Sequence, residues 1–156
     1  MNGTIAKAKT RWEENGEKCL TILSRILDVP RASFEKEYNA SFTFSKRCPF
    51  HENVFMLNHF SDFLVVAMHE TMHIEFLKVY RGYCKELGLS DDQISHLKEI
   101  LTALLNEEMG GCFEHPDRGY TKHQKIREKI AKLYRERKSS NFSGFLKEIA
   151  PFVLIP

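Results

Sequence analysis

Six neighbouring residues combine side chains that can bind a metal ion and use it. Residues 68–73 read M-H-E-T-M-H and contain the spacing H-E-x-x-H within a long apolar segment. Residues four apart on an α-helix project from one face, so His69 and His73 can bind one tetrahedral Zn²⁺. Glu70 then lies beside the open position of the metal, where water binds. Because zinc makes that water acidic, the spacing predicts zinc-dependent hydrolysis of peptide bonds with Glu70 as general base.

The same three residues also have a purely structural interpretation, with two hydrogen-bonded core histidines and an ordinary helical glutamate. With seven histidines in 156 residues, H-E-x-x-H arises by chance in roughly 3% of such chains. Two observations favour the metal site. The spacing lies in the middle of a predicted helix, and the preceding residues 64–68 are all apolar. Burying two histidines and a glutamate without partners would be costly.

A catalytic zinc needs a third protein ligand. The extended spacing H-E-x-x-H-x-x-G-x-x-H is absent, because Phe76 and Val79 stand where its glycine and third histidine would be. Residues 106–110 read N-E-E-M-G near the end of the next predicted helix. If that helix packs antiparallel to the first, it returns a carboxylate to the metal, from Glu107 or from its neighbour Glu108.

Residues from about 53 to 111 resemble the gluzincins, zinc peptidases in which a later helix carries a ligand glutamate. That glutamate commonly follows an asparagine and precedes a small residue by three positions, as Asn106, Glu107 and Gly110 do here. The short chain and the order of sheet before helix are similar to the minigluzincins and to related intracellular domains that act on bacterial repressors. The resemblance implies Glu107 as third zinc ligand beside His69 and His73, and a polypeptide substrate.

The remaining polar residues near this segment have simpler interpretations. Glu114, His115 and Asp117 are expected in a polar surface loop, and three further histidines at the surface or at helix caps: His51, His59 and His96. Tyr120 and His123 follow the predicted ligand helix, where such families often place a donor for the oxyanion. Nothing in the sequence determines the position of either.

The elements that must position these residues can be read from apolar periodicity and turn residues. The expected elements are a helix over 10–27, strands over 40–45 and 53–58, the metal helix over 60–87, a helix from 91 to about 109, a loop over 112–120, a basic helix over 121–138 and a short apolar tail. Asn58 or Ser61 is the expected N-cap of the metal helix, and Gly88 its end. Strand 53–58 is expected beside the cleft, where an edge strand can pair with an extended substrate.

This order predicts a single α+β domain over residues 1–156, with a zincin-like fold in which a small sheet packs against the active-site helix. The four cysteines include no C-x-x-C pair and are expected as reduced thiols. No stretch of 18 uncharged apolar residues and no signal-like N-terminus is present. A soluble cytoplasmic protein without a membrane partner is therefore expected, and its oligomeric state stays open.

Three other functions were weighed. Residues 121–140 contain eight Lys or Arg and two Glu, a charge density found in nucleic-acid-binding proteins, but a solvated helix face explains it more simply. Glu70-x-x-His73 also matches half of the metal site in ferritin-like bundles, which need a second such pair that the chain lacks. A zincin-like domain that binds metal or a protein partner without catalysis is the third alternative.

Overall fold

The computed structural model describes residues 2–44, 50–58, 62–137 and 141–154. Helices and a small sheet together confirm the α+β class. The elements in chain order are α1 (Asn2–Leu27), η1 (Arg31–Ser33), β1 (Asn39–Thr43), β2 (Phe50–His51), β3 (Val54–Asn58), α2 (Phe63–Glu86), α3 (Asp91–Leu101), α4 (Ala103–Met109), η2 (Thr121–His123), α5 (Gln124–Glu136) and α6 (Phe142–Leu154).

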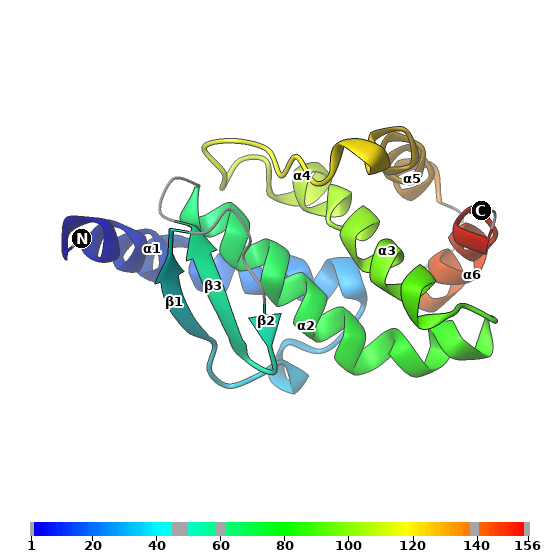
Figure 1. The fold of residues 1–156 in the computed structure, drawn as a ribbon, viewed down its shortest axis with the longest axis horizontal. Coiled ribbons are helices and arrows are strands. Elements are labelled where there is room, and N and C mark those ends of the chain that lie inside the picture. The colour runs from blue at the N-terminus through cyan, green and yellow to red at the C-terminus, as the bar shows by residue number, and fades with distance from the viewer. Residues whose placement is uncertain (1, 45–49, 59–61, 138–140, 155–156) are drawn as a thin grey trace.

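Helix α2 lies at the centre and contacts α1, α3, α6 and the sheet (Figure 1). Its N-cap is Asp62, whose carboxylate accepts hydrogen bonds from the backbone N–H of Leu64 and Val65. The predicted caps were wrong: Asn58 ends strand β3, and Ser61 lies outside the described residues. Gly88 follows the helix with a φ of 87°, a left-handed conformation that glycine adopts without strain, which confirms the predicted end.

The sheet has the strand order β1-β3-β2, with β1 parallel and β2 antiparallel to β3. Strand β3 is therefore central, and the expectation that it offers a free edge beside the cleft was wrong over its paired residues. The two-residue strand β2 lies at that edge instead, because Phe50 pairs with Phe55 and His51 with Val54. One face of the sheet covers α2 through a small apolar cluster that includes Phe55, Leu57, Ala67 and Ile74.

Helix α3 begins at the predicted capping box, in which Ser90 and Gln93 satisfy each other's backbone N–H groups. The helix predicted to continue to about residue 109 instead breaks at Thr102, and α4 follows. Both Thr102 Oγ1, at 2.9 Å, and Arg127 Nη1, at 2.9 Å, donate to the carbonyl oxygen of Glu99. These donors occupy the oxygen that would accept the next helical hydrogen bond, which explains the break.

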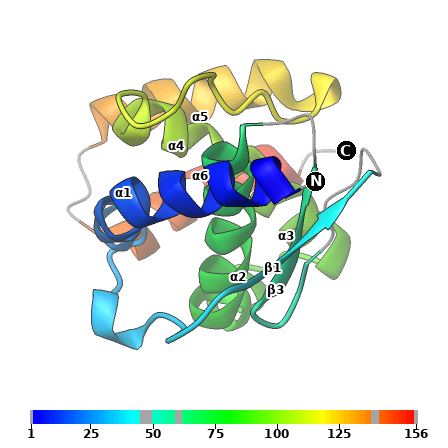
Figure 2. The same ribbon diagram turned by 90° about the vertical axis from the view of Figure 1, so that its left-hand side faces the viewer.

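The C-terminal helices α5 and α6 lie on the side of the molecule away from the sheet (Figures 1 and 2). Helix α5 buries Ile130, Ala131 and Tyr134, and the predicted apolar tail forms helix α6, which buries Phe142 and Phe145. Of these, Ile130, Tyr134, Phe142 and Phe145 join side chains of α1, α2 and α3 in the main hydrophobic core. Within the described residues, no helix has the length and hydropathy needed to cross a membrane.

Candidate metal centre

Three donor atoms from α2 and α3 converge between these two helices. The rings of His69 and His73 lie 4.4 Å apart on one face of α2. The Oε2 atom of Glu99, on α3, lies 3.3 Å from Nε2 of His69 and 3.5 Å from Nε2 of His73. The predicted pairing of the two histidines on one helix face is thus present, and the third group is a carboxylate.

The two distances from Glu99 Oε2 match edges of a tetrahedral metal site, and the donor atoms of the three residues lie within 4.8 Å of one another. Bonds of 2.0–2.1 Å from zinc to nitrogen and oxygen place neighbouring ligand atoms about 3.3 to 3.4 Å apart. One of the nitrogen atoms at the site also lacks a hydrogen-bond partner, because Nε2 of His73 is buried without one. Because buried polar atoms are almost always satisfied, this nitrogen is suited to a metal ion, and the three residues fit Zn²⁺.

A carboxylate behind His69 orients its ring. Nδ1 of His69 lies 3.0 Å from Oδ1 of Asp117, so Nδ1–H donates to Asp117 and Nε2 faces Glu99. Carboxylate–histidine pairs of this kind select the tautomer that binds metal. Asp117 is 7% exposed, so the expectation of a surface position was wrong for this residue. Two hydrogen bonds between its backbone and the side-chain amide of Asn106 keep the loop over α2.

Arg127 of the basic helix supports the same carboxylate. Its Nη2 donates to Oδ2 and to the carbonyl oxygen of Asp117, both at 2.9 Å. Its Nη1 donates to Glu99 O and Thr102 Oγ1. Gly119 has a φ of 58°, and a Cβ there would lie 2.6 Å from Arg127 Nη1. The loop from α4 to α5 is therefore built to admit this buried guanidinium.

The charges of these groups are mutually dependent. Burial alone lowers the pKa of His69, but hydrogen bonds to Asp117 and Glu99 raise it to about 9. Burial is the largest single influence and raises the pKa of both carboxylates, but the hydrogen bond from His69 and the nearby positive charges together outweigh it. The pKa of Glu99 therefore falls to about 2 and that of Asp117 falls well below its usual range. Burial lowers the pKa of His73 to about 4. Without metal, the ring of His69 is therefore protonated on both nitrogens and positively charged at neutral pH, whereas that of His73 is neutral.

The remaining groups at the site are Glu70 and Lys98. Glu70 is buried, and its Oε2 lies 3.5 Å from Nδ1 of His73. The ammonium of Lys98 forms an ion pair with Oε1 of Glu99, lies 3.3 Å from Nδ1 of His73, and is 5.4 Å from the ring centre of Phe50. Strand β2 thus borders the site through Phe50, whose ring is 5.7 Å from that of His73.

The structure brings Glu99, not Glu107, to the two histidines. Glu107 lies on α4, where its Oε2 accepts a hydrogen bond of 2.6 Å from Arg135 of α5. Its rival Glu108 is exposed and contributes to the raised pKa of Tyr134. The break at Thr102 separates both residues from the helix that faces α2. Among the described residues, Glu99 is therefore the candidate third ligand, and no spacing in the sequence singled it out.

The other predicted candidates lie around the site without joining it. Glu114 pairs with Arg11 at 3.3 Å, and His115 is exposed, as expected for the loop. The ring of His123 is buried and stacks edge-on with those of His96 and Tyr120, at centroid distances of 5.3 and 5.8 Å. His51 and His96 are exposed, and His59 lies outside the described residues.

Several cations of the basic helix have partners within the molecule. Besides Arg127 and Arg135, Lys129 lies 3.4 Å above the ring of Phe152, Lys132 is 4.0 Å from Glu136, and Arg137 lies over the ring of Tyr134. The contacts of Arg127, Lys129 and Arg135 join the basic segment to neighbouring elements, while those of Lys132 and Arg137 stay within the segment.

In comparisons with protein-family models, curated proteins and solved structures, the chain has no match. The chemistry of the site must therefore be argued from its own geometry.

Proposed function

We propose that this chain is a zinc-dependent peptidase with a zincin-like fold, in which His69, His73 and Glu99 hold the metal. The observation that supports this most directly is the convergence of two imidazole nitrogens and one carboxylate oxygen within 4.8 Å of one another, with the oxygen 3.3 and 3.5 Å from the two nitrogens. Two histidines and one glutamate form the ligand set of several zinc peptidases. The cytoplasm remains the proposed location.

Each residue has a distinct task in this proposal. Bound zinc would supply a Lewis acid that polarises the peptide carbonyl and makes water more acidic. Glu70 follows the first ligand directly on α2, and its buried carboxylate accepts the proton of the attacking water and passes it to the leaving amine. Asp117 keeps a proton on Nδ1 of His69, which leaves Nε2 free to bind.

The decisive experiment separates metal binding from catalysis. Zinc-loaded protein is incubated with a peptide library, and cleavage products are identified by mass spectrometry. The matched variant Glu70→Gln keeps the size of the side chain but cannot accept a proton. It is expected to retain one zinc and to lose about 10²- to 10⁴-fold in rate. Cleavage at an equal rate by wild type and Glu70→Gln would refute the proposal.

A second candidate function is metal or partner binding without catalysis, and one contact favours it. When Lys98 donates to Nδ1 of His73, Nε2 of that ring carries the proton and cannot bind metal. The ammonium then provides the positive charge beside Glu99. In that case wild-type protein takes up zinc weakly, Lys98→Met takes it up tightly, and neither cleaves peptides. Binding of nucleic acid is less favoured, because many basic residues of α5 already have intramolecular partners.

A further inference from the structure

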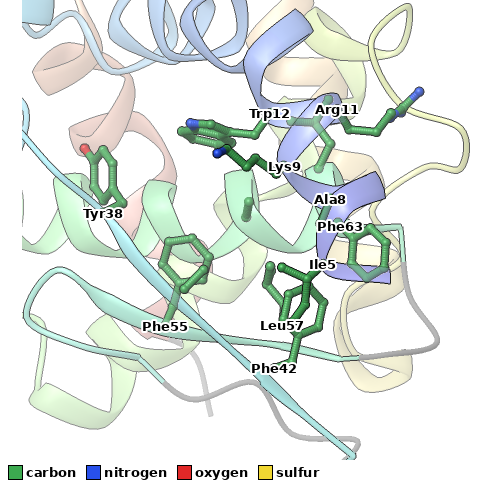
Figure 3. A pocket seen from close by; sticks show the side chains of 13 residues that line it. Ile5, Ala8, Lys9, Arg11, Trp12, Tyr38, Phe42, Phe55, Leu57 and Phe63 are labelled. Carbon is green, nitrogen blue, oxygen red and sulfur yellow. The ribbon is translucent and has the colours of Figure 1, made fainter. Parts of the chain in front are cut away.

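A pocket lies on the side of α2 that faces away from His69 and His73. It is a pocket of about 200 Å³ between α1, the sheet and the N-terminal half of α2 (Figure 3). Five aromatic residues line it: Trp12, Tyr38, Phe42, Phe55 and Phe63. An apolar cavity of about 150 Å³ is large enough to bind benzene. This pocket therefore has room for one benzene ring with a short side chain.

The two walls of the pocket are held apart by separate contacts. Tyr38, on the sheet side, donates a hydrogen bond of 2.5 Å from its hydroxyl to Glu75 of α2. Arg11, on α1, pairs with Glu114 and donates to the carbonyl oxygen of Cys112. Small side chains stand on each wall, at Ala8, Ala40 and Ala67. The hollow thus follows from the choice of small residues between fixed walls.

Charge at the pocket distinguishes between possible ligands. Lys9 and Arg11 line it, and among its described lining residues none is acidic. The guanidinium of Arg11 points away in Figure 3 and is occupied by Glu114. Lys9 has one exposed partner, Glu13 at 3.8 Å, and such surface pairs are weak. Its ammonium can therefore meet an anionic group at the mouth.

From these features we infer that the pocket between α1 and the sheet binds a small aromatic carboxylate, with the ring among the aromatic residues and the carboxylate at Lys9. This site is separate from the histidine cluster and does not depend on the proposed peptidase activity. Ile5, which is 44% exposed beside the pocket, would lose contact with water when the ligand binds.

The chain carries its own reporter for a test, because Trp12 is its one tryptophan. Wild-type protein is titrated with 3-phenylpropionate, with its neutral amide and with 3-phenylpropylamine, while Trp12 emission is recorded. The acid is expected to give a saturable change. The amide should bind about two- to fivefold more weakly, as for the loss of an exposed charge pair, and the amine more weakly still. Equal or tighter binding of the amide or amine would overturn the assignment to carboxylates.

Substitutions in the walls of the pocket test whether the change in Trp12 emission comes from binding there. Ala8→Leu fills the pocket from α1 and Ala40→Leu fills it from the sheet, and both should abolish binding without lowering the melting temperature. Ala6→Leu is the matched control, because Ala6 is exposed on α1 and does not line the pocket. Lys9→Gln should bind acid and amide equally. A response that persists in folded Ala8→Leu and Ala40→Leu would refute the site, as would the absence of any saturable change in wild type.

Carboxylates also bind zinc, so one control separates the two sites. His73→Ala removes a proposed metal ligand and should leave the response of Trp12 to 3-phenylpropionate unchanged. If that variant loses the response, the ligand acts at the metal centre and the pocket assignment fails.

Discussion

Two glutamates are enclosed on different sides of helix α2: Glu75 of α2 itself, and the partly buried Glu99 of α3. The groups that face them differ. Glu75 lies between α2 and the segment that leads into β1, and it is 0% exposed. Its Oε1 accepts hydrogen bonds from the hydroxyl of Tyr38 and the backbone N–H of Glu35, and its Oε2 lies 4.0 Å from the ammonium of Lys78. Two hydrogen-bond donors and one nearby cation therefore stabilise the buried charge, although Oε2 itself accepts no hydrogen bond from the described residues.

Glu99, on the side of α3, meets nitrogen atoms that bind a metal through their lone pairs. Oε2 of Glu99 lies 3.3 Å from Nε2 of His69 and 3.5 Å from Nε2 of His73. A carboxylate oxygen and the lone pair of a ring nitrogen come this close only when a proton or another cation lies between them. The comparison teaches that burial of a carboxylate does not by itself indicate function. What distinguishes the candidate metal centre is that its buried carboxylate faces groups able to act as ligands.

The largest expected effect concerns the third ligand. Glu99→Ala removes a donor atom and should weaken zinc binding by more than about 100-fold, beyond the range for residues behind the ligands. Glu107→Ala, the matched control on α4, should bind zinc as wild type does. Affinities are measured by competition with a chromogenic chelator. Tight zinc binding by Glu99→Ala, together with loss of binding in Glu107→Ala, would identify Glu107 as the third ligand instead.

On the other side of α2, Glu75→Ala should act on stability and leave zinc binding intact. The change leaves the hydroxyl of Tyr38 and the N–H of Glu35 without their acceptor, at a cost of about 2 to 4 kcal/mol in the free energy of unfolding. Urea denaturation of the metal-free protein measures it. Tyr38→Phe removes a single donor and should cost less. A stable Glu75→Ala protein with reduced zinc affinity would break the comparison.

A smaller effect is expected behind the ligands. Asp117→Asn keeps the shape of the side chain but weakens the hydrogen bond that orients His69, and should lower zinc affinity about 10- to 100-fold. Arg127→Met acts through Asp117 and should show a similar loss with a larger fall in stability, because the guanidinium is buried. If Asp117→Asn binds zinc as tightly as the wild type does, the hydrogen bond to Asp117 is not needed to orient the ring of His69.

The smallest expected effect is the release of one proton from His69 when zinc binds. The pKa of His69 is raised to about 9 without metal, so zinc must displace a proton from this ring at pH 7. Zinc affinity should therefore rise with pH and level off above about 9, while the stability that this proton provides is complete below about pH 6.5 and is lost as the pH rises through about 9. Calorimetry in buffers of different ionisation enthalpy counts the proton. No release at pH 7 would contradict this order of events.

The sequence predicted the metal helix and the two histidines because their chemistry depends on spacing within one element. The C-terminal end of α2 and the start of α3 followed from short-range signals, namely Gly88 and the capping box at Ser90. Such signals act between residues a few positions apart, so they can be read without knowledge of the tertiary structure.

The position of Glu99, the proposed third ligand, could not be predicted in the same way. Glu99 lies on the opposite side of α3 from its apolar stripe, a position that usually faces solvent. It is enclosed because the loop with Asp117 and the side chain of Arg127 fold back over it, 18 and 28 residues later in the chain. The break at Thr102, which turns Glu107 away, also depends on Arg127. Long-range contacts of one buried arginine thus decide which glutamate reaches the histidines.

Gly88 joins the two helices that carry the three proposed ligands, and it contacts none of them. A Cβ at this position would meet open space, so the backbone conformation alone requires glycine. Any other residue there strains the turn by about 1 to 2 kcal/mol, and the least costly relief is a change in the angle between α2 and α3. A genetic selection for loss of metal would therefore recover substitutions at Gly88, at the far end of the hairpin, alongside those at the ligands themselves.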